Sequence, residues 1–257
     1  MLGNRKLGRI VAAPFQPRNY LALLNMARLS PQRVALLRAY LTGAGRYPLR
    51  AVVRTPVGPI DVKLHSSHDV LTLNEIFFRE DYRCRRDIEV VVDIGSNIGI
   101  SALYFLSRNR HSRCYCFEPD PRNVAKLHEN LAPFEGRYEL SECAVSDMDK
   151  MVDFGIEATG RYGGIDVRAE NTIRVRSLAV NDVVAGILDR EGQIDLIKID
   201  TEGLEERTVR AIESEHLARI ETILFEAPEK TGPLHPGFYE KRRRGHVERL
   251  VALESEA

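Results

Sequence analysis

The sequence predicts an α/β fold with a doubly wound, mostly parallel sheet of the Rossmann-like type, preceded by an N-terminal helical and hairpin extension. Apolar, β-branched runs alternate with segments of helical periodicity along most of the chain. The run Val90–Val92 ends on Asp93 and leads through a glycine-containing turn into an apolar helical segment. Later runs also end on acidic or polar residues. Parallel strands covered by helices on both faces have this pattern, with their carboxyl ends around one crevice.

Composition limits the class of protein. The chain has 257 residues, of which 44% are hydrophobic and 29% charged, as in an ordinary globular protein. This length allows one α/β domain plus an extension, so we expect a basic helical and hairpin region over residues 1–85 and an α/β domain over residues 86–257. No apolar run approaches the ~20 residues that span a bilayer. We expect a cytoplasmic protein.

The formal net charge of zero hides a strong asymmetry between the two ends of the chain. No acid precedes Asp61, and the segment before it carries ten basic residues: Arg5, Lys6, Arg9, Arg18, Arg28, Arg33, Arg38, Arg46, Arg50 and Arg54. Such a segment suits phosphate, an anionic membrane or the acidic remainder of the protein. An acid-poor, arginine-rich start is also typical of organelle transit peptides. We hypothesise that this region docks a phosphate- or membrane-linked substrate.

The N-terminal extension shows helix and hairpin signals in turn. Helical spacing covers residues 19–29, and Ser30 followed by a proline predicts the cap of a second helix ending near residue 41. Residues 50–64 predict a hairpin. His65 and His68 then fall in a polar loop before a further helix. They have no third ligand at a recognisable spacing, so we expect a loop near the substrate mouth and no metal.

The remainder of the chain alternates between strands and helices. Strands are predicted at 89–93, 112–118, 137–145, 173–178, 194–199 and 221–226, with helices at 100–106, 123–131, 181–188 and after Gly203. A glycine-broken segment, residues 151–167, predicts an inserted hairpin or loop. Residues 238–252 look too short for a closing antiparallel hairpin. The basic run Lys241–Arg244 lacks interleaved aromatic residues, so we expect a solvated helix face and no nucleic acid binding.

The four cysteines lack the paired spacing of a metal site. Cys114 and Cys116 share one face of a predicted strand. A soft-metal or redox pair is one interpretation, but cysteine is among the most buried residue types. We therefore expect core packing.

Several predicted strand ends carry carboxylates that would meet at one crevice: Asp93, Glu118, Asp200 and Glu226. Together they disfavour a pyrophosphate and favour a cation. The turn between Gly95 and Gly99 places Asn97 where a dinucleotide-binding turn has a glycine, and asparagine tolerates left-handed backbone well. S-adenosylmethionine fits this crevice, since it has ribose hydroxyls, an ammonium and a sulfonium but no phosphate.

The sequence resembles the FkbM-type methyltransferases and, through them, the class I S-adenosylmethionine-dependent enzymes. The matching stretches are VVDIGSNIGISALYF, YCFEPDPRNVAKLHENL, AVSD, IDLIKIDTEGLE and ILFE, which lie within residues 88–226. The Lys-Ile-Asp-x-Glu-Gly block is the most characteristic of them. The resemblance implies O-methylation of a hydroxyl on a sugar, polyketide or related metabolite, hence a small-molecule or glycan acceptor.

Carried over by position, the resemblance implies a role for each matching residue. The methionine end of the cofactor would be cradled by Asp93, Gly95, Ser96, Asn97 and Gly99; the ribose would be held by Glu118; the adenine would be bordered by Ala144 and Val145; and the methyl group would face Asp200, with Glu202 lining the opening. Asp200 is the first candidate for a general base, and His65 and His68 are the reserves. An alternative role for Asp200 is to cap the following helix. Lys198 fits a structural ion pair.

Two other classes of protein share the opening strand and turn. One is an NAD-dependent oxidoreductase, disfavoured by Asn97 and by the lack of an obvious hydride-transfer constellation. The other is a non-catalytic binding module that kept the fold, disfavoured by the acids at the strand ends. Binding of S-adenosylhomocysteine, of NAD or of neither separates the three.

Overall fold

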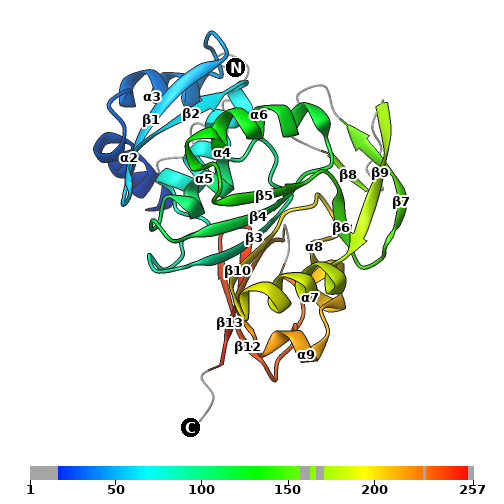
Figure 1. Ribbon diagram of the computed structural model, residues 1–257. Coiled ribbons are helices and arrows are strands. Elements are labelled where there is room, and N and C mark those ends of the chain that lie inside the picture. Colours follow the sequence, from blue (N-terminus) through cyan, green and yellow to red (C-terminus); the bar gives the residue numbers. More distant parts are fainter. Residues whose placement is uncertain (1–16, 157–162, 166–170, 228–229, 254–257) are drawn as a thin grey trace. The chain divides into compact units, whose positions relative to one another are not determined.

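The computed structural model describes residues 17–156, 163–165, 171–227 and 230–253. The chain divides into two compact units, residues 1–86 and 87–257 (Figure 1). Every helix in the described ranges is too short or too polar to cross a membrane.

The N-terminal unit combines helices with a two-stranded hairpin. Its elements are α2 (Pro17–Leu29), α3 (Arg33–Thr42), β1 (Leu49–Thr55), β2 (Gly58–Leu64), α4 (Ser67–Leu73) and the π-helix η2 (Asn74–Phe78). The predicted first helix and the hairpin are confirmed. Ser30 does not cap α3, which begins later at Arg33; its hydroxyl instead accepts a hydrogen bond from the backbone of Gln32. The Arg18 guanidinium pairs with buried Asp81.

The predicted loop at His65 and His68 is only partly correct. The Ser66 side chain and the Asp69 carboxylate form a capping box, with the backbone N–H groups of His65 and Ser66 donating to Asp69 at 2.6 and 2.8 Å. This cap starts α4 at Ser67, so His68 lies within the helix.

The C-terminal unit is built on a seven-stranded sheet. Its strands, in spatial order, are β12 (Tyr239–Arg244), β13 (Val247–Ala252), β11 (Ile220–Glu226), β10 (Ile194–Ile199), β3 (Val90–Ile94), β4 (Arg113–Phe117) and β5 (Tyr138–Ser141). The five from β11 to β5 are parallel, and β13 and β12 are antiparallel to their neighbours. Chain order reverses at the boundary between β3 and β10, which makes this boundary the switch point. The predicted doubly wound, mostly parallel sheet is confirmed.

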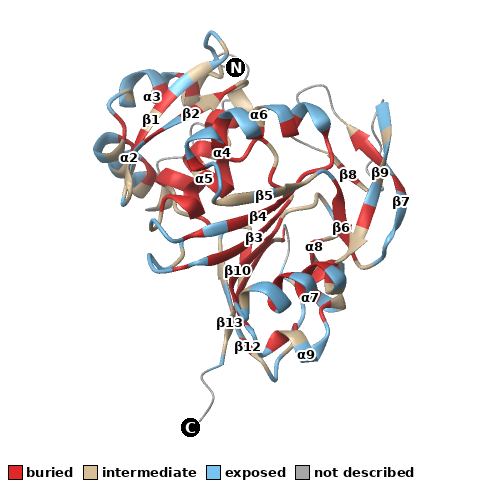
Figure 2. Ribbon diagram, in the orientation of Figure 1, coloured by how far each residue is buried: buried red, intermediate tan, exposed pale blue. Residues whose placement is uncertain are grey.

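Helices cover both faces of this sheet. They are α5 (Ile100–Leu106), α6 (Pro121–Leu131) with the short η3 (Ala132–Phe134), α7 (Val180–Glu191), α8 (Glu205–Ala211) and α9 (Ser214–Leu217). In Figure 1, α5 and α6 lie on one side of the central strands and α7 and α9 on the other. Every residue of β3 and β10 is buried, so the red strands at the centre of Figure 2 are the core of the unit.

A smaller four-stranded sheet packs beside the large one. Its order is β6 (Ala144–Ser146), β9 (Asn171–Ala179), β7 (Lys150–Ile156) and β8 (Gly163–Ile165). The strand predicted over residues 137–145 is thus two strands in different sheets, because the chain turns where the Cys143 N–H donates to the Ser141 carbonyl. Strands β7 and β8 pair antiparallel, so the hairpin predicted in the glycine-broken segment is present. Its residues 157–162 and 166–167 lie outside the described ranges.

Two expectations about the C-terminal stretch were wrong. Residues 239–252 do form the closing hairpin, since a two-residue turn at Gly245 and His246, with Gly245 at φ +68°, leaves enough chain for two six-residue strands. The basic run Lys241–Arg244 lies on β12 and not on a helix. As β12 is the edge of the sheet, its charged side chains suit a strand exposed on one edge.

Candidate functional site

The turn after β3 has the left-handed backbone that its sequence predicted. Gly95, Asn97 and Gly99 have φ values of +77°, +49° and +83°. Gly95 also admits no side chain, because a Cβ there would overlap the carbonyl oxygen of Asp200. The Asp200 N–H donates to the Ile94 carbonyl at 3.1 Å. The turn after β3 and the loop after β10 are therefore in backbone contact.

A buried lysine ties these two strand ends together. Lys198 is 2% exposed, and its Nζ lies 3.1 Å from Asp93 Oδ1 and 3.6 Å from Asp200 Oδ2. The ammonium also donates to the Gly95 carbonyl at 2.6 Å. Burial opposes the charged lysine, but Asp93 and Asp200 outweigh it and raise the pKa of Lys198 above its ordinary value. Lys198 is thus a charged structural cross-link, as the ion-pair interpretation predicted.

Asp93 lies behind the turn and not on its open side. The carboxylate is fully buried, with Oδ2 accepting a hydrogen bond from Ser101 Oγ at 2.6 Å. Ser96 is also buried, and its hydroxyl donates to the Asp93 carbonyl at 2.7 Å. Both residues therefore stabilise the turn through buried hydrogen bonds.

Glu118 follows β4 and is fixed by backbone groups. Its two oxygens accept N–H groups of Asn97 and Asp120 at 2.8 and 2.9 Å. Asn123 Nδ2 approaches the same carboxyl group at 3.4 Å. Burial raises the pKa of Glu118 to about 7, although the backbone donors oppose the shift. The carboxyl group is therefore held in one orientation and titrates near neutral pH.

Asp200 lies farther than Asp93 from the shared Lys198 ammonium. Its side chain remains 28% exposed. Burial and the negative charge of Glu226 raise the pKa of Asp200 to about 8, while Lys198 acts in the opposite direction. Asp200 does not cap the next helix: α8 begins at Glu205, whose own carboxylate accepts the N–H groups of Thr201 and Gly203. The capping alternative is therefore wrong.

These strand ends line a pocket that is partly open to solvent. Seven of the predicted cofactor residues line it: Gly95, Asn97, Glu118, Ala144, Val145, Asp200 and Glu202. Asp93, Ser96 and Gly99 do not line it. His65 and His68 belong to the N-terminal unit, whereas all the lining residues belong to the C-terminal unit.

Sequence reasoning missed part of the lining. Phe117 and Asp120 flank Glu118, so their position beside a predicted ribose acid was an available signal. Phe154 and Ile165 come from the β7–β8 hairpin, and no sequence periodicity placed that hairpin beside the pocket. The buried Thr201 Oγ1 also borders the pocket and has no hydrogen-bond partner among the described residues.

The predicted packing of the cysteines is confirmed by burial. Cys114 and Cys116 are fully buried, and their sulfurs lie 3.6 Å apart. Asp93 brings a third potential metal-binding atom near both. Its carboxylate already neighbours the Lys198 ammonium, which would repel a cation.

Fold and site together define an α/β protein of the Rossmann-like class, with its pocket at the carboxyl ends of the strands beside the switch point. The chain belongs to the FkbM methyltransferase domain family, whose match covers residues 93–238.

Curated relatives agree with this assignment. The 31-O-demethyl-FK506 methyltransferase FkbM of Streptomyces tacrolimicus is 26% identical over 78% of this chain and 89% of its own. The 2-O-methyltransferase NoeI of Sinorhizobium fredii is 43% identical over 65 residues, which are 25% of this chain and 26% of NoeI. The antimetabolite synthetase AmbE of Pseudomonas aeruginosa is 28% identical over 66% of this chain and 10% of its own. The chain thus spans about a quarter of NoeI and a tenth of AmbE.

Solved structures give more distant matches. A Staphylococcus aureus protein assigned as a caffeoyl-CoA O-methyltransferase has a TM-score of 0.46 at 11% identity, over 91% of this chain and 98% of its own. TrmK of M. capricolum, solved with S-adenosylhomocysteine, has a TM-score of 0.36 at 12% identity, over 70% of this chain and 66% of its own. The fold class is therefore assigned from the order and direction of the strands in this chain, and not from these matches.

Proposed function

We propose that this chain is an S-adenosylmethionine-dependent O-methyltransferase acting on a hydroxyl of a sugar, a glycan or a polyketide-type metabolite. One observation carries the proposal. The pocket at the switch point is lined by four acids, Glu118, Asp120, Asp200 and Glu202, and its described lining includes no lysine or arginine. Such a lining suits a cation, which would favour the ionised forms of Glu118 and Asp200, whose pKa values are raised, and it opposes a pyrophosphate, which would disfavour them. It supports a sulfonium-bearing donor over a dinucleotide.

The residues present fit this donor. Glu118 keeps acceptor capacity beyond its two backbone hydrogen bonds, since each carboxylate oxygen can accept more than one donor, which suits two ribose hydroxyls. Val145 and Phe154 offer apolar surface for an adenine. Thr201 Oγ1, buried without a hydrogen-bond partner in the described chain, would gain one from a polar ligand.

The donor, when bound, supplies a methyl group already activated by its sulfonium. The chain's main task is then to position the acceptor oxygen, which contributes up to roughly 7–11 kcal/mol to lowering the barrier. Asp200 takes the hydroxyl proton on its carboxylate. A carboxyl group whose pKa is near 8 is a stronger base than an ordinary aspartate and lies close to working pH. A cation in the pocket would favour its ionised form.

The class of acceptor is inferred from the relatives. NoeI and FkbM carry names that specify transfer to oxygen. These names support an alcohol acceptor for this chain.

Calorimetry with S-adenosylhomocysteine and, separately, NAD tests the cosubstrate. We expect binding of the first at micromolar concentration and none of the second. NAD binding would support an oxidoreductase, and binding of neither would support a non-catalytic module. Labelled S-adenosylmethionine with a panel of sugar and polyketide alcohols then tests transfer to oxygen.

Asp200→Asn tests the base. We expect turnover to fall by roughly 10²–10⁴-fold, because no carboxylate remains to take the proton of the substrate hydroxyl. S-adenosylhomocysteine should still bind. Asp189→Asn, an exposed acid on α7 outside the pocket, is the matched control. Full activity of Asp200→Asn would remove Asp200 as the base, and His65→Ala and His68→Ala would then be assayed as the reserves.

A further inference from the structure

Helix α2 presents apolar side chains on both of its faces. The inner face buries Ala22 and Met26, and α2 packs on η2. The outer face carries Tyr20, Leu23 and Leu24, which are 55%, 44% and 69% exposed. A helix on the surface of a globular protein normally shows polar residues on this side. The outer face of α2 is therefore apolar, and none of the described residues of the N-terminal unit buries it.

Helix α3 also carries an exposed apolar side chain. It is joined to α2 by only three residues and buries Leu36 and Ala39 on its inner side. Val34, near its start, is 76% exposed, more than any other large hydrophobic residue that the structure describes. Two consecutive helices thus both project apolar side chains outward.

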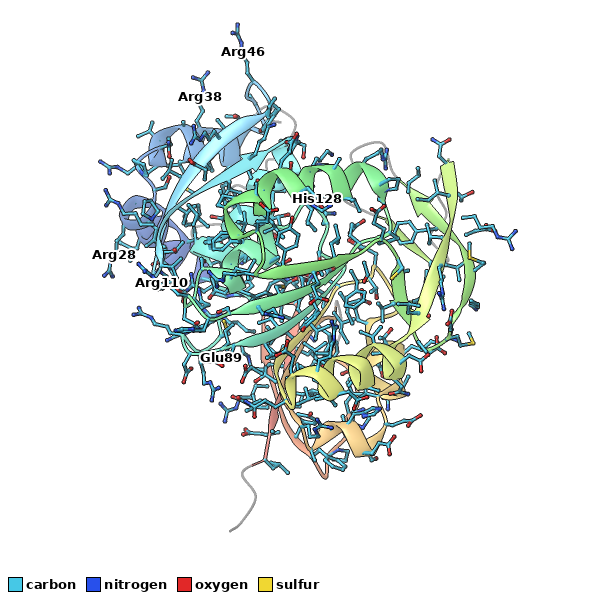
Figure 3. All side chains as sticks on the ribbon, viewed as in Figure 1. Arg28, Arg38, Arg46, Glu89, Arg110 and His128 are labelled. Carbon is cyan, nitrogen blue, oxygen red and sulfur yellow. The ribbon has the colours of Figure 1, made fainter. Side chains whose placement is uncertain are left out.

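Uncompensated cations accompany these apolar residues. Arg28, Arg33, Arg38 and Arg46 are exposed, and none forms an ion pair with another described residue. Figure 3 shows Arg28, Arg38 and Arg46 extending away from the ribbon. No acid precedes Asp61 in the sequence, so the local field stays positive.

We propose that the outer surface of α2 and α3 docks onto an anionic lipid bilayer. An interfacial helix inserts Leu and aromatic side chains at the boundary between headgroups and acyl chains, while its arginines meet lipid phosphates. Tyrosine is enriched at this depth, because its ring is apolar and its hydroxyl is polar. Apolar contact and positive charge act together here, as stable attachment requires.

Other occupants fit this surface less well. A second copy of the chain would place the same arginines against each other, since a two-fold interface pairs identical patches. An acidic protein would satisfy the charges but would need a shape complementary to isolated side chains such as Leu24 and Val34. A fluid bilayer adapts to such side chains, and its broad charged plane matches cations spread over the sequence from Arg28 to Arg46.

Vesicle co-sedimentation of the full-length chain tests the proposal. Phosphatidylcholine vesicles with roughly a third phosphatidylglycerol are compared with pure phosphatidylcholine. We expect at least tenfold tighter binding to the anionic vesicles, weakening as salt rises. Leu23→Gln with Leu24→Gln should weaken binding by about tenfold or more, because two buried apolar side chains are lost. Arg28→Gln, Arg33→Gln and Arg38→Gln should each weaken it by about fivefold.

Matched controls lie in the C-terminal unit. Met151→Gln and Arg110→Gln alter an exposed apolar residue and an exposed cation there, and should leave binding unchanged. Coincident thermal unfolding of all variants would show that folding is intact. Equal binding by wild type and the Leu23/Leu24 variant, or equal affinity for soluble polyglutamate, would overturn the proposal in favour of an acidic partner. A dimer that the same variant dissociates would overturn it in favour of a second copy.

Discussion

Asp93 and Asp200 stand at the ends of neighbouring parallel strands and share one lysine, yet their surroundings differ. Asp93 is fully buried, 3.1 Å from Lys198 and hydrogen-bonded to Ser101. Asp200 is 28% exposed, 0.5 Å farther from the same ammonium (3.6 minus 3.1), and faces the negative charge of Glu226. One ammonium carries a single positive charge and cannot fully neutralise two carboxylates. Asp93 is the better compensated of the two, and the pKa of Asp200 is raised.

This difference in charge compensation bears on what each carboxylate can do at this edge of the sheet. A compensated, buried carboxylate fixes the backbone around it. A poorly compensated carboxyl group that faces a pocket can gain or lose a proton near neutral pH. The same residue type at equivalent strand ends therefore has different charge compensation, which is set by its neighbours.

Removing the compensated carboxylate should have the largest effect. Asp93→Ala leaves the Lys198 ammonium buried with its nearest counter-charge gone, and we expect the free energy of unfolding to fall by roughly 3–5 kcal/mol. Urea denaturation measures this change. Asp153→Ala, an exposed acid on β7, is the control and should change little.

A loss below about 1 kcal/mol for Asp93→Ala would contradict the role assigned to this carboxylate. Pairing Asp93→Asn with Lys198→Met sharpens the result. The double variant should be less destabilised than the sum of the single ones, because neither charge is then left buried alone.

Gly95→Ala tests the backbone contact between the two strand ends. The new Cβ would overlap the Asp200 carbonyl, so the loop that positions this acid must shift. Gly136→Ala is a close control, since Gly136 has φ +78° against +77° for Gly95 but has open space around it. The control therefore measures only the cost of placing alanine in left-handed backbone, which is about 1–2 kcal/mol. We expect Gly95→Ala to lower the free energy of unfolding, measured by urea denaturation, by roughly 1–3 kcal/mol more than Gly136→Ala does. It should also weaken S-adenosylhomocysteine binding. Equal costs for both variants would rule out the overlap.

Much of this edge could be predicted from sequence. Strand ends at Asp93, Glu118 and Asp200 follow from β-branched runs that stop at an acid, and parallel strands bring such ends together. The left-handed position of Asn97 followed from local turn chemistry. These features depend on short-range patterns, which a single sequence records.

Other features depend on partners distant in sequence. The edge strand β12 carries so many charges that no period-2 apolar pattern remained, and only its pairing with β13 defines it. Phe154 lines the pocket because β7 pairs with β9 of the small sheet. Lys198 Nζ lies about half an ångström closer to the Asp93 carboxylate than to the Asp200 carboxylate, and the order of residues does not encode so small a difference.

Asp200→Asn should also stabilise the ligand-free protein. A raised pKa means that the folded state retains a proton that the unfolded chain releases, so stability falls as pH rises from about 4 to about 8. Asparagine has no charge to develop. We expect a gain of roughly 1–2 kcal/mol near pH 8, seen as a rise of a few degrees in Tm, and no electrostatic gain near pH 4. A Tm difference independent of pH would show that Asp200 is ionised throughout.

Glu118 should give the smallest effect, a pH dependence of cosubstrate binding. Its pKa of about 7 lies above the ordinary value because burial disfavours the charge, so the carboxyl group ionises as pH rises from 6 to 8. The carboxylate accepts hydroxyl hydrogen bonds more strongly than the acid does. Calorimetry should therefore show S-adenosylhomocysteine binding about threefold tighter at the higher pH. Glu118→Gln should remove the dependence, whereas Glu202→Gln, on the same pocket, should keep it. If Glu118→Gln retained the full dependence, another group would be titrating, and the raised pKa of Asp200 makes that acid the next one to replace.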